Sequence, residues 1–290
     1  MLIGCAGSPL VAGCPQLAQD DFRDGAAAGA AGAGSTTGAP DAAVGSGAGD
    51  GGPPDAAPPP PTPEQALRAA VANRYDLNGS GTSATDSVGS HPGYIYNTQL
   101  TGAGYLALNG SGQYLSLDNG LISSGNDKTV EAWLSWRGGA PWQRIFDFGS
   151  SDAGDLMQGT GVSYLYLTPM SDTGVALVGF SISGYAAELR LAGTAPVPIG
   201  TLTHVAVVID GSHDTLALYR DGALDTSTTL TQQLASIIDF NLWVGHSQFA
   251  TDPDLDADVM EFRIYAQALD AEQVALSYRL GPDGLPAAMP

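Results

Sequence analysis

The sequence predicts an all-β protein: a two-sheet antiparallel sandwich with short flanking helices, preceded by a disordered N-terminal tether. Short apolar runs recur along the chain, separated by glycine, asparagine and aspartate turn signals, which is the pattern of antiparallel strands. No helical stretches lie between these runs, and this excludes a parallel βαβ architecture. The 290 residues can bury one large core, so we expect one folded domain over residues 64–290.

Two cysteines near the start of the chain predict a lipid anchor. Cys5 and Cys14 each end a short run of small and apolar residues that resembles a bacterial lipobox. A complete signal peptide also has a basic start and a longer apolar stretch, and residues 1–19 show neither. We therefore expect a truncated lipoprotein signal there, with Cys5 or Cys14 lipidated. Because both cysteines lie in this region, neither a disulfide framework nor a cysteine zinc site is expected in the folded domain.

Residues 20–63 are expected to form a disordered linker. From residue 25 onward this segment contains only alanine, glycine, serine, threonine, proline, aspartate and a single Val44. Burial of such residues cannot offset the entropy lost on ordering them. The proline-rich end favours extended polyproline II structure. We expect a tether that holds the folded domain at the outer cell surface, away from its anchor.

Capping signals predict one helix at each end of the folded domain. Thr62 begins a capping box with proline at the first helical position, and this predicts a helix that runs to about Arg74. Asp270 begins a second box, and the helix that follows is expected to end at Gly281. Between the two helices, the Asp-Gly pair at residues 221–222 predicts a tight hairpin turn.

The stretch of residues 129–149 is expected to form the centre of the sandwich. It contains three of the four tryptophans, and its first eight residues alternate with the period of a strand. Large aromatic rings occur among the residues of each face of this strand, which predicts a central strand that is covered on both faces. Trp133 and Trp243 are expected to anchor the core between the two sheets.

A glycine-rich corner within this stretch is a candidate ligand site. It is flanked by Trp136, Arg137, Trp142 and Gln143. Aromatic rings stack on the faces of sugars, and arginine or glutamine side chains hydrogen-bond to hydroxyl groups. These four residues therefore predict a carbohydrate-binding rim. The alternative is that both tryptophan rings cap the core.

Charge and composition restrict the possible partners. The formal net charge is −20, from 30 acidic and 10 basic residues. A chain without a basic surface cannot neutralise phosphates, so nucleic-acid binding is excluded. No segment is long and apolar enough to span a bilayer, so membrane contact is expected only through a lipid anchor. The many aspartates suit turns, and they also suit an oxygen-ligated cation such as calcium.

Two acidic loops are candidate cation sites. Residues 76–81 match the first half of an EF-hand loop, with oxygen donors at the first, third and fifth positions and glycine at the sixth. The twelfth position is Ser87 instead of an acid, and strands are expected to follow, so an EF-hand is rejected. A simpler cation site and a solvated turn both remain. Residues 248–256 form a second acidic loop with the same two alternatives.

Taken in order, several runs resemble the landmark strands of one family. They are GYLALNGSGQYLSL, TVEAWLSW, RIFDFG, THVAVVIDG, LALYRDG, NLWVGHS and EFRIYAQALDAEQV. The series resembles the laminin-G-like jelly-roll family, which belongs with the concanavalin-A-like lectins and glucanases, over residues 74–278. The resemblance implies a jelly-roll sandwich with one concave sheet and loops at its rims.

The same resemblance implies a calcium ion at the rim. Many laminin-G-like domains take calcium ligands from the start of the domain and from the strand that matches MEFRIY. Carried over to this sequence, the candidate ligands are Asp76, Asn78, Asp86 and Glu261. The sequence departs from the family at Met260, where an aspartate often stands.

The sequence carries no recognisable catalytic motif. Glucanases of this fold resemble one another in a Glu-x-Asp-x-Glu strand, because a retaining mechanism needs two carboxyl groups about 5 Å apart. None of the five glutamates here has an acid two residues later. Glu131 is expected instead to form a half-buried ion pair with Arg144 or Arg263, and His204 to be a packed strand residue. A cross-strand catalytic pair such as Glu131 and Glu261 is the alternative.

These observations predict a non-catalytic recognition or adhesion module that acts outside the cell. Its expected partner is a carbohydrate or an extracellular protein, with calcium as a structural cofactor. One alternative is a glycoside hydrolase or lyase whose carboxylates the sequence pattern does not reveal. Another is a purely structural surface protein that binds no small ligand.

Overall fold

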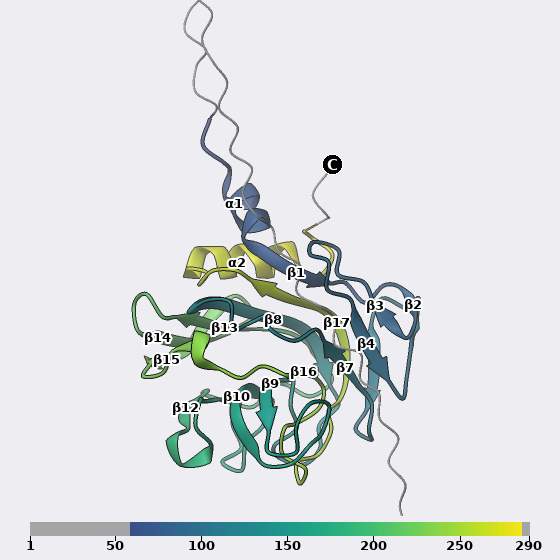
Figure 1. The fold of residues 1–290 in the computed structure, drawn as a ribbon. Helices are drawn as coiled ribbons and strands as arrows, with labels where there is room; N and C mark the ends of the chain where they lie inside the picture. The colour runs from purple at the N-terminus through teal and green to yellow at the C-terminus, as the bar shows by residue number, and fades with distance from the viewer. Residues whose placement is uncertain (1–58, 286–290) are drawn as a thin grey trace, which may run out of the picture. The chain divides into compact units, whose positions relative to one another are not determined.

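Two antiparallel β-sheets, stacked face to face, form the body of the protein (Figure 1). The computed structural model describes residues 59–285, and it confirms the predicted all-β sandwich with short flanking helices. The predicted lipidation residues Cys5 and Cys14, and nearly all of the predicted linker, lie outside the described residues. Within residues 59–285, no helix has the length and apolar character needed to cross a bilayer.

The first sheet has seven strands. Its order is β1-β17-β8-β13-β14-β15, and β6 pairs with β17 as well. The strands are β1 Val71–Tyr75, β6 Leu106–Asn109, β8 Asp127–Trp136, β13 Leu202–Asp210, β14 Thr215–Arg220, β15 Ala223–Thr229 and β17 Asp256–Tyr265. Strand β8 lies between β17 and β13, which confirms the central strand predicted there. Asp221 and Gly222 both have positive φ, 48° and 76°, in the β14–β15 turn, as the predicted Asp-Gly hairpin requires.

The second sheet has eight strands in the order β12-β11-β10-β9-β16-β7-β4-β3. They are β3 Ser83–Ala84, β4 Gly93–Tyr96, β7 Tyr114–Leu117, β9 Phe146–Ser151, β10 Gly161–Thr168, β11 Leu177–Ser181, β12 Leu189–Ala192 and β16 Asn241–Val244. Strands β2 Ser80–Gly81 and β5 Leu100–Thr101 form a separate pair, and two 3-10 turns, η1 Tyr185–Ala187 and η2 Leu234–Ser236, lie in the connections.

The main core lies between the sheets and takes alternate residues from each strand. Trp136 of β8 and Phe148 of β9 are among its fully buried members. Trp133 was expected in this core, and that prediction was wrong. The strand period of two points Trp133 to the outer face of the seven-stranded sheet, where its ring contacts His204 at 4.6 Å between centroids. Trp243 is likewise buried outside this core, on the outer face of the eight-stranded sheet.

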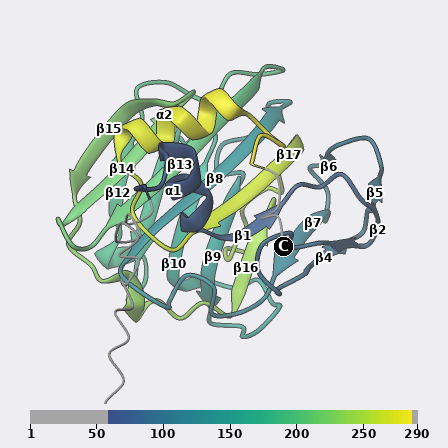
Figure 2. The same ribbon diagram turned by 90° about the horizontal axis from the view of Figure 1, so that it is seen from above.

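Two helices cover the outer face of the seven-stranded sheet (Figure 2). They are α1 Pro63–Ala70 and α2 Ala271–Leu280, and each begins with the capping box that the sequence predicted. Helix α1 ends at Ala70 instead of near Arg74, because residues 71–75 pair with β17 as strand β1. A second apolar cluster, which includes Leu67 of α1 and Val274 of α2, fixes the helices to the sheet.

A fully buried ionic network lies beneath α2. The carboxylate of Glu131 accepts hydrogen bonds from Tyr265 at 2.7 Å and Ser277 at 2.8 Å, and it pairs with Arg263 at 3.4 Å. His204 Nε2 lies 2.6 Å from the other Glu131 oxygen. Burial raises the pKa of Glu131, but the hydrogen bond and charge of His204, followed by the charge of Arg263, outweigh it and lower that pKa. The predicted partner Arg263 is confirmed, although the pair is fully buried because α2 covers it.

Removal of this carboxylate should destabilise the fold strongly. Glu131→Ala leaves His204 buried without its acidic partner and removes one of the two carboxylates that pair with Arg263, and we expect a loss of about 3–5 kcal/mol in the free energy of unfolding at pH 7. Because the native pKa of Glu131 is lowered, its stabilisation is present above the ordinary glutamate range and fades as the pH falls through the native pKa. Urea unfolding measures both effects.

The control for this variant is Glu272→Gln, at an exposed position in the first turn of α2. That change should cost less than about 1 kcal/mol. An equally small loss for Glu131→Ala would contradict the role assigned to the buried network.

Candidate functional site

The structure separates the four residues of the predicted ligand rim. Trp136 is buried in the main core, and its indole N–H donates to the Gln143 side chain at 2.6 Å. Both residues are therefore closed to a ligand, and this part of the prediction was wrong. Arg137 forms ion pairs with Asp256 and Asp258 of the neighbouring strand β17. Only Trp142 lines a pocket, because its positive φ of 73° turns it away from the core.

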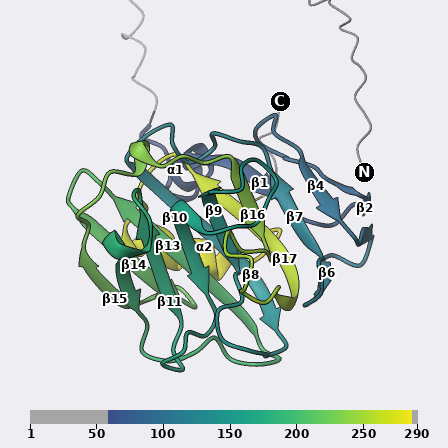
Figure 3. The same ribbon diagram turned by 60° about the horizontal axis from the view of Figure 1, so that its bottom comes forward.

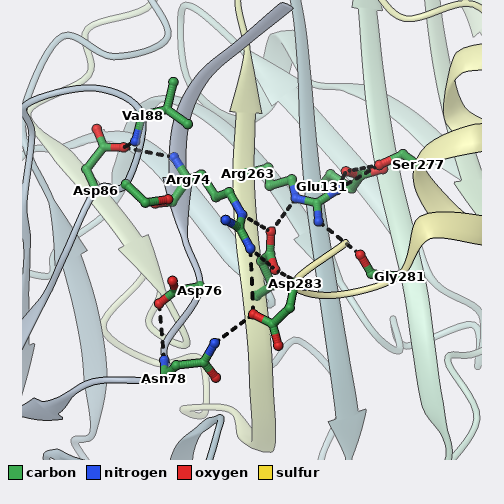
Figure 4. Close-up of polar contacts among 12 residues, drawn as sticks. Arg74, Asp76, Asn78, Asp86, Val88, Glu131, Arg263, Ser277, Gly281 and Asp283 are labelled. Carbon is green, nitrogen blue, oxygen red and sulfur yellow. Dashed lines mark hydrogen bonds and ion pairs between the residues drawn. The ribbon is translucent and has the colours of Figure 1, made fainter. Parts of the chain in front are cut away.

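The predicted metal ligands Asp86 and Glu261 are already bonded within the protein, and Figure 4 shows the contacts of Asp86. Both are buried. Glu261 pairs with Arg74 at 2.7 Å and with Arg263, and it accepts the backbone N–H of Asp283 at 2.6 Å. Burial raises the pKa of Asp86, but hydrogen bonds from the Arg74 backbone and neighbouring donors outweigh it and lower that pKa. Through Glu261, these contacts connect Arg74 near the start of the domain to Asp283 near its end.

The remaining predicted ligands do not complete a cation site. Asp76 accepts the backbone N–H of Asn78 at 3.2 Å, and the Asn78 side chain donates to Asp283 at 2.6 Å (Figure 4). In the acidic loop, Asp252 pairs with Arg144 and Asp254 with His246. Within the described part of the chain, no group of three or more His, Cys, Asp or Glu is arranged to hold a metal ion. The residues present do not fit the expected site, and calcium binding stays a prediction that melting with EDTA or added calcium tests.

Glu131 and Glu261, the alternative catalytic pair, are on the helix-covered face of the seven-stranded sheet. Neither side chain has any exposed surface. Each accepts bonds from an arginine and from further donors, so no oxygen of the pair faces a path for substrate. A catalytic role for this pair is therefore contradicted by its burial.

A pocket of about 280 Å³ lies on the outer face of the eight-stranded sheet. We call it the Trp142 pocket. It is lined by aromatic rings, two guanidinium groups and three carboxyl groups, from Trp142, Arg144, Tyr166, Asp172, Tyr185, Glu188, Arg190, Phe249 and Asp252. Its volume is near the lower end of the range of ligand pockets. Figure 3 shows the sheet from this side, with β9, β10 and β16 at its centre and α2 behind.

Arg144 organises one side of the Trp142 pocket. Its guanidinium lies 4.0 Å from the centre of the Tyr166 ring, donates to the Trp142 carbonyl at 2.7 Å, and pairs with Asp252. Tyr166 can lie flat across the next strand because Gly179 has no side chain. A Cβ added at Gly179 would come within 2.3 Å of the ring. The glycine thus fixes the shape of the pocket floor.

Glu188 and Arg190 form the opposite side. The Glu188 carboxylate accepts hydrogen bonds from Tyr164 at 2.7 Å and Tyr166 at 3.0 Å, and it pairs with Arg190 at 2.7 Å. The Arg190 guanidinium lies 5.6 Å from the Trp142 ring centre and 5.0 Å from that of Tyr185. Tyr185 is 63% exposed. The rings and charges of this side are therefore held in place while their outer faces meet solvent.

Beneath the pocket, Asp147 is a buried acid with unused hydrogen-bonding capacity. Its Oδ2 accepts the backbone N–H of Gln248 at 2.9 Å and lies 3.3 Å from Arg144 Nε, whereas its Oδ1 has no partner. Burial raises the pKa of Asp147 to about 6, against the opposing charge of Arg144. Burial likewise raises the pKa of nearby Asp252. The site therefore contains two acids that hold protons more tightly than aspartates in water.

The sequence pattern identified one member of the pocket, Trp142, and missed the others. The alternation in VSYLYLTP does place Tyr164 and Tyr166 on one face of β10, and this signal was available. Glu188 and Arg190 are also two residues apart, flanking the start of β12. No local pattern shows that these pairs meet, because the meeting depends on the order of strands in the sheet.

Comparisons with known proteins agree with this architecture. A family model described as the Concanavalin A-like lectin/glucanases superfamily matches residues 109–275. A search of curated protein sequences found no match. The structure is similar to Trypanosoma rangeli sialidase in complex with sialic acid, with a TM-score of 0.57 and 12% identity over 73% of this chain and 33% of that chain.

Two further solved structures show the same kind of likeness. The binding domain of botulinum neurotoxin DC, in complex with rat synaptotagmin II, has a TM-score of 0.55 and 10% identity over 73% of this chain and 52% of that chain. Domain 4 of AbnA, a GH43 extracellular arabinanase from Geobacillus stearothermophilus, in complex with arabinotriose, has a TM-score of 0.49 and 20% identity over 71% and 85%. The chain spans about a third of the sialidase and about half of the toxin chain. At these identities the likeness to the sialidase and to the toxin domain shows the fold alone.

Asp147 should give the stability of the protein a distinct pH dependence. A raised native pKa means that the unfolded chain loses its proton first, so the native state loses stability as the pH rises from about 4 through 6. Asp147→Asn cannot titrate. Relative to wild type, its free energy of unfolding should rise by up to about 3 kcal/mol between pH 4 and pH 7.

Urea unfolding at several pH values measures this difference, with Asp214→Asn, an exposed turn residue, as the control variant. A difference between Asp147→Asn and wild type that stays constant across this pH range would contradict the assignment.

Proposed function

The chain belongs to the Concanavalin A-like lectin/glucanases superfamily, and on that premise we propose that it binds a saccharide in the Trp142 pocket without cutting it. One observation carries the proposal: the rings of Trp142 and Tyr185 line one pocket and both lie near the guanidinium of Arg190, which pairs with Glu188. An aromatic ring can stack on the apolar face of a sugar. The adjacent charged groups offer both donors and acceptors to its hydroxyl groups, which can act in either role.

The chemistry of the pocket favours a neutral or weakly charged sugar. Two guanidinium groups and three carboxyl groups line it, so positive and negative charges nearly balance in the pocket. The whole chain, by contrast, has a formal net charge of −20. Arg190 bonds Glu188 through its Nε and is 38% exposed, which leaves its outer edge open toward a ligand. A pocket of about 280 Å³ suits one end or one unit of a glycan better than a large apolar ligand.

A hydrolase is the second candidate, because carboxyl groups meet in the pocket although the sequence has no catalytic Glu-x-Asp-x-Glu strand. Burial raises the pKa of Asp252, and a proton held in this way is what a general acid needs. Glu188 already accepts bonds from two tyrosines and Arg190. These bonds favour a structural role for Glu188, and so favour binding over hydrolysis. Release of reducing sugars that is lost in Asp252→Asn would establish the hydrolase instead.

In this proposal the module acts outside the cell, where residues 1–63 would carry it as a lipid-anchored tether. An extracellular protein is the alternative partner. Mass spectrometry of the native chain tests the anchor, because lipidation adds a defined mass to Cys5 or Cys14. A soluble chain with both cysteines unmodified would contradict the anchor and leave the saccharide proposal intact.

A glycan array followed by titration calorimetry tests the function. We expect wild type to bind a defined saccharide and Trp142→Ala to weaken that binding by about tenfold or more, about 1.4 kcal/mol. Trp142→Phe, which retains a ring, should keep part of the affinity. Leu224→Ala removes an exposed apolar side chain from the seven-stranded sheet, away from the pocket, and should have no effect. Absence of any saccharide binding by wild type, or an unchanged affinity in Trp142→Ala, would overturn the proposal.

A further inference from the structure

A second pocket lies on the same outer face, on the far side of β16. It has a volume of about 610 Å³ and combines exposed tyrosines with polar groups, from His91, Tyr94, Tyr96, Ser116, Leu117, Asp118, Asn119, Asp155 and Leu156. We call it the Tyr94 pocket. Tyr94 is 52% exposed although it lies within a regular strand. No contact described so far explains why this strand presents a large ring to solvent.

The second tyrosine of the Tyr94 pocket is rigidly supported. The Tyr96 ring stacks on Tyr114, with centroids 4.7 Å apart and planes within 6°. Tyr114 in turn stacks on His246 at 4.3 Å. A stack of this kind fixes the ring before any ligand arrives, which lowers the entropy cost of binding. On the polar side, His91 and Asp118 are paired at 3.1 Å.

One row of cross-strand neighbours joins the two pockets. It runs through seven strands of the eight-stranded sheet and consists of Tyr94, Ser116, Trp243, Asp147, Tyr166, Gly179 and Arg190. Its first two members line the Tyr94 pocket, and Tyr166 and Arg190 line the Trp142 pocket. Ser116 and Tyr166 are three strands apart, a distance of about 14 Å at the usual spacing between strands.

The loop between β16 and β17 bonds to the middle of this row, lines the Trp142 pocket and supports the tyrosine stack of the Tyr94 pocket. Its Gln248 N–H donates to Asp147 at 2.9 Å, and its Phe249 and Asp252 line the Trp142 pocket. On the other side, His246 supports the tyrosine stack of the Tyr94 pocket. A single loop therefore forms part of the Trp142 pocket and, through His246 and Tyr114, supports the ring of Tyr96 in the Tyr94 pocket.

We propose that the Tyr94 pocket is a second saccharide subsite, so that one oligosaccharide chain occupies both pockets across the row. This inference rests on the proposed function of the Trp142 pocket. One sugar unit of the oligosaccharide would stack on Tyr94 and Tyr96, and its hydroxyl groups would bond to the neighbouring Asp118 and Asn119. The oligosaccharide would then cross the intervening loop to reach Trp142. Two linked contacts raise affinity because the second binding step becomes intramolecular. Oligosaccharides that are too short to bridge the two pockets do not gain this increase in affinity.

The test is the dependence of affinity on chain length. The full chain is probed with an array of defined oligosaccharides of one to six units from the cello, xylo, chito, manno and arabino series, and the series that binds is titrated by calorimetry. We expect the affinity to rise at least about tenfold once the oligosaccharide is long enough to span both pockets. Tyr94→Ala should remove this rise and leave the affinity for the shortest binding saccharide unchanged. Tyr94→Phe should retain most of it.

The outcomes separate this inference from the function on which it rests. If no saccharide binds wild type, the proposed function itself fails. If binding depends on Trp142 but neither chain length nor Tyr94→Ala alters it, the second subsite is wrong and the proposed function stands. Thermal melting shows whether Tyr94→Ala is folded. If Tyr94→Ala is unfolded, Tyr94→Phe serves instead. Equal affinities of wild type and Tyr94→Phe that do not change with oligosaccharide length would also overturn the second subsite.

Discussion

The buried charges beneath α2 determine which side of this protein can meet a ligand. Glu131, Arg263, Glu261 and Arg74 lie on the outer face of the seven-stranded sheet, all almost or fully inaccessible. Charges buried in this way are tolerated only when they are paired and covered, so the helices and the C-terminal turn must close that face. The same pairs account for the acids that looked like metal ligands or catalysts. Within residues 59–285 no α-helix covers the eight-stranded sheet, and its outer face carries the two pockets that we propose as saccharide sites.

Features set by local chemistry could be predicted from the sequence. The strands follow from alternation, both helix starts from capping boxes, and the β14–β15 turn from its Asp-Gly pair. Features set by distant partners could not. Helix α1 ends early because residues 71–75 pair with β17, which begins at Asp256. Trp133 and Trp136 differ by three positions, and only the placement of the second sheet decides which of them enters the main core.

The candidate site shows the same limit more strongly. Trp142 was identified because it stands beside a glycine corner, yet Arg144, Tyr166, Glu188 and Asp252 come from four separate segments. Their meeting depends on the register of β9, β10, β11 and β12. The oxygen donors chosen as metal ligands have partners within the protein that the sequence pattern did not reveal, for a related reason. Residue type shows that a carboxylate can bind calcium. It does not show that the Glu261 carboxylate pairs with Arg74, or that the Asp86 carboxylate accepts a backbone N–H.

The central claim is that the outer face of the eight-stranded sheet binds the ligand. The four tryptophans report on it directly, because each indole N–H gives one nuclear magnetic resonance signal. Trp142 lines the first pocket and Trp243 lies in the row between the pockets, whereas Trp136 is in the main core and Trp133 is on the helix-covered face. On titration with a bound saccharide, the signals of Trp142 and Trp243 should shift and those of Trp133 and Trp136 should stay in place. Shifts confined to Trp133 or Trp136 would contradict the account.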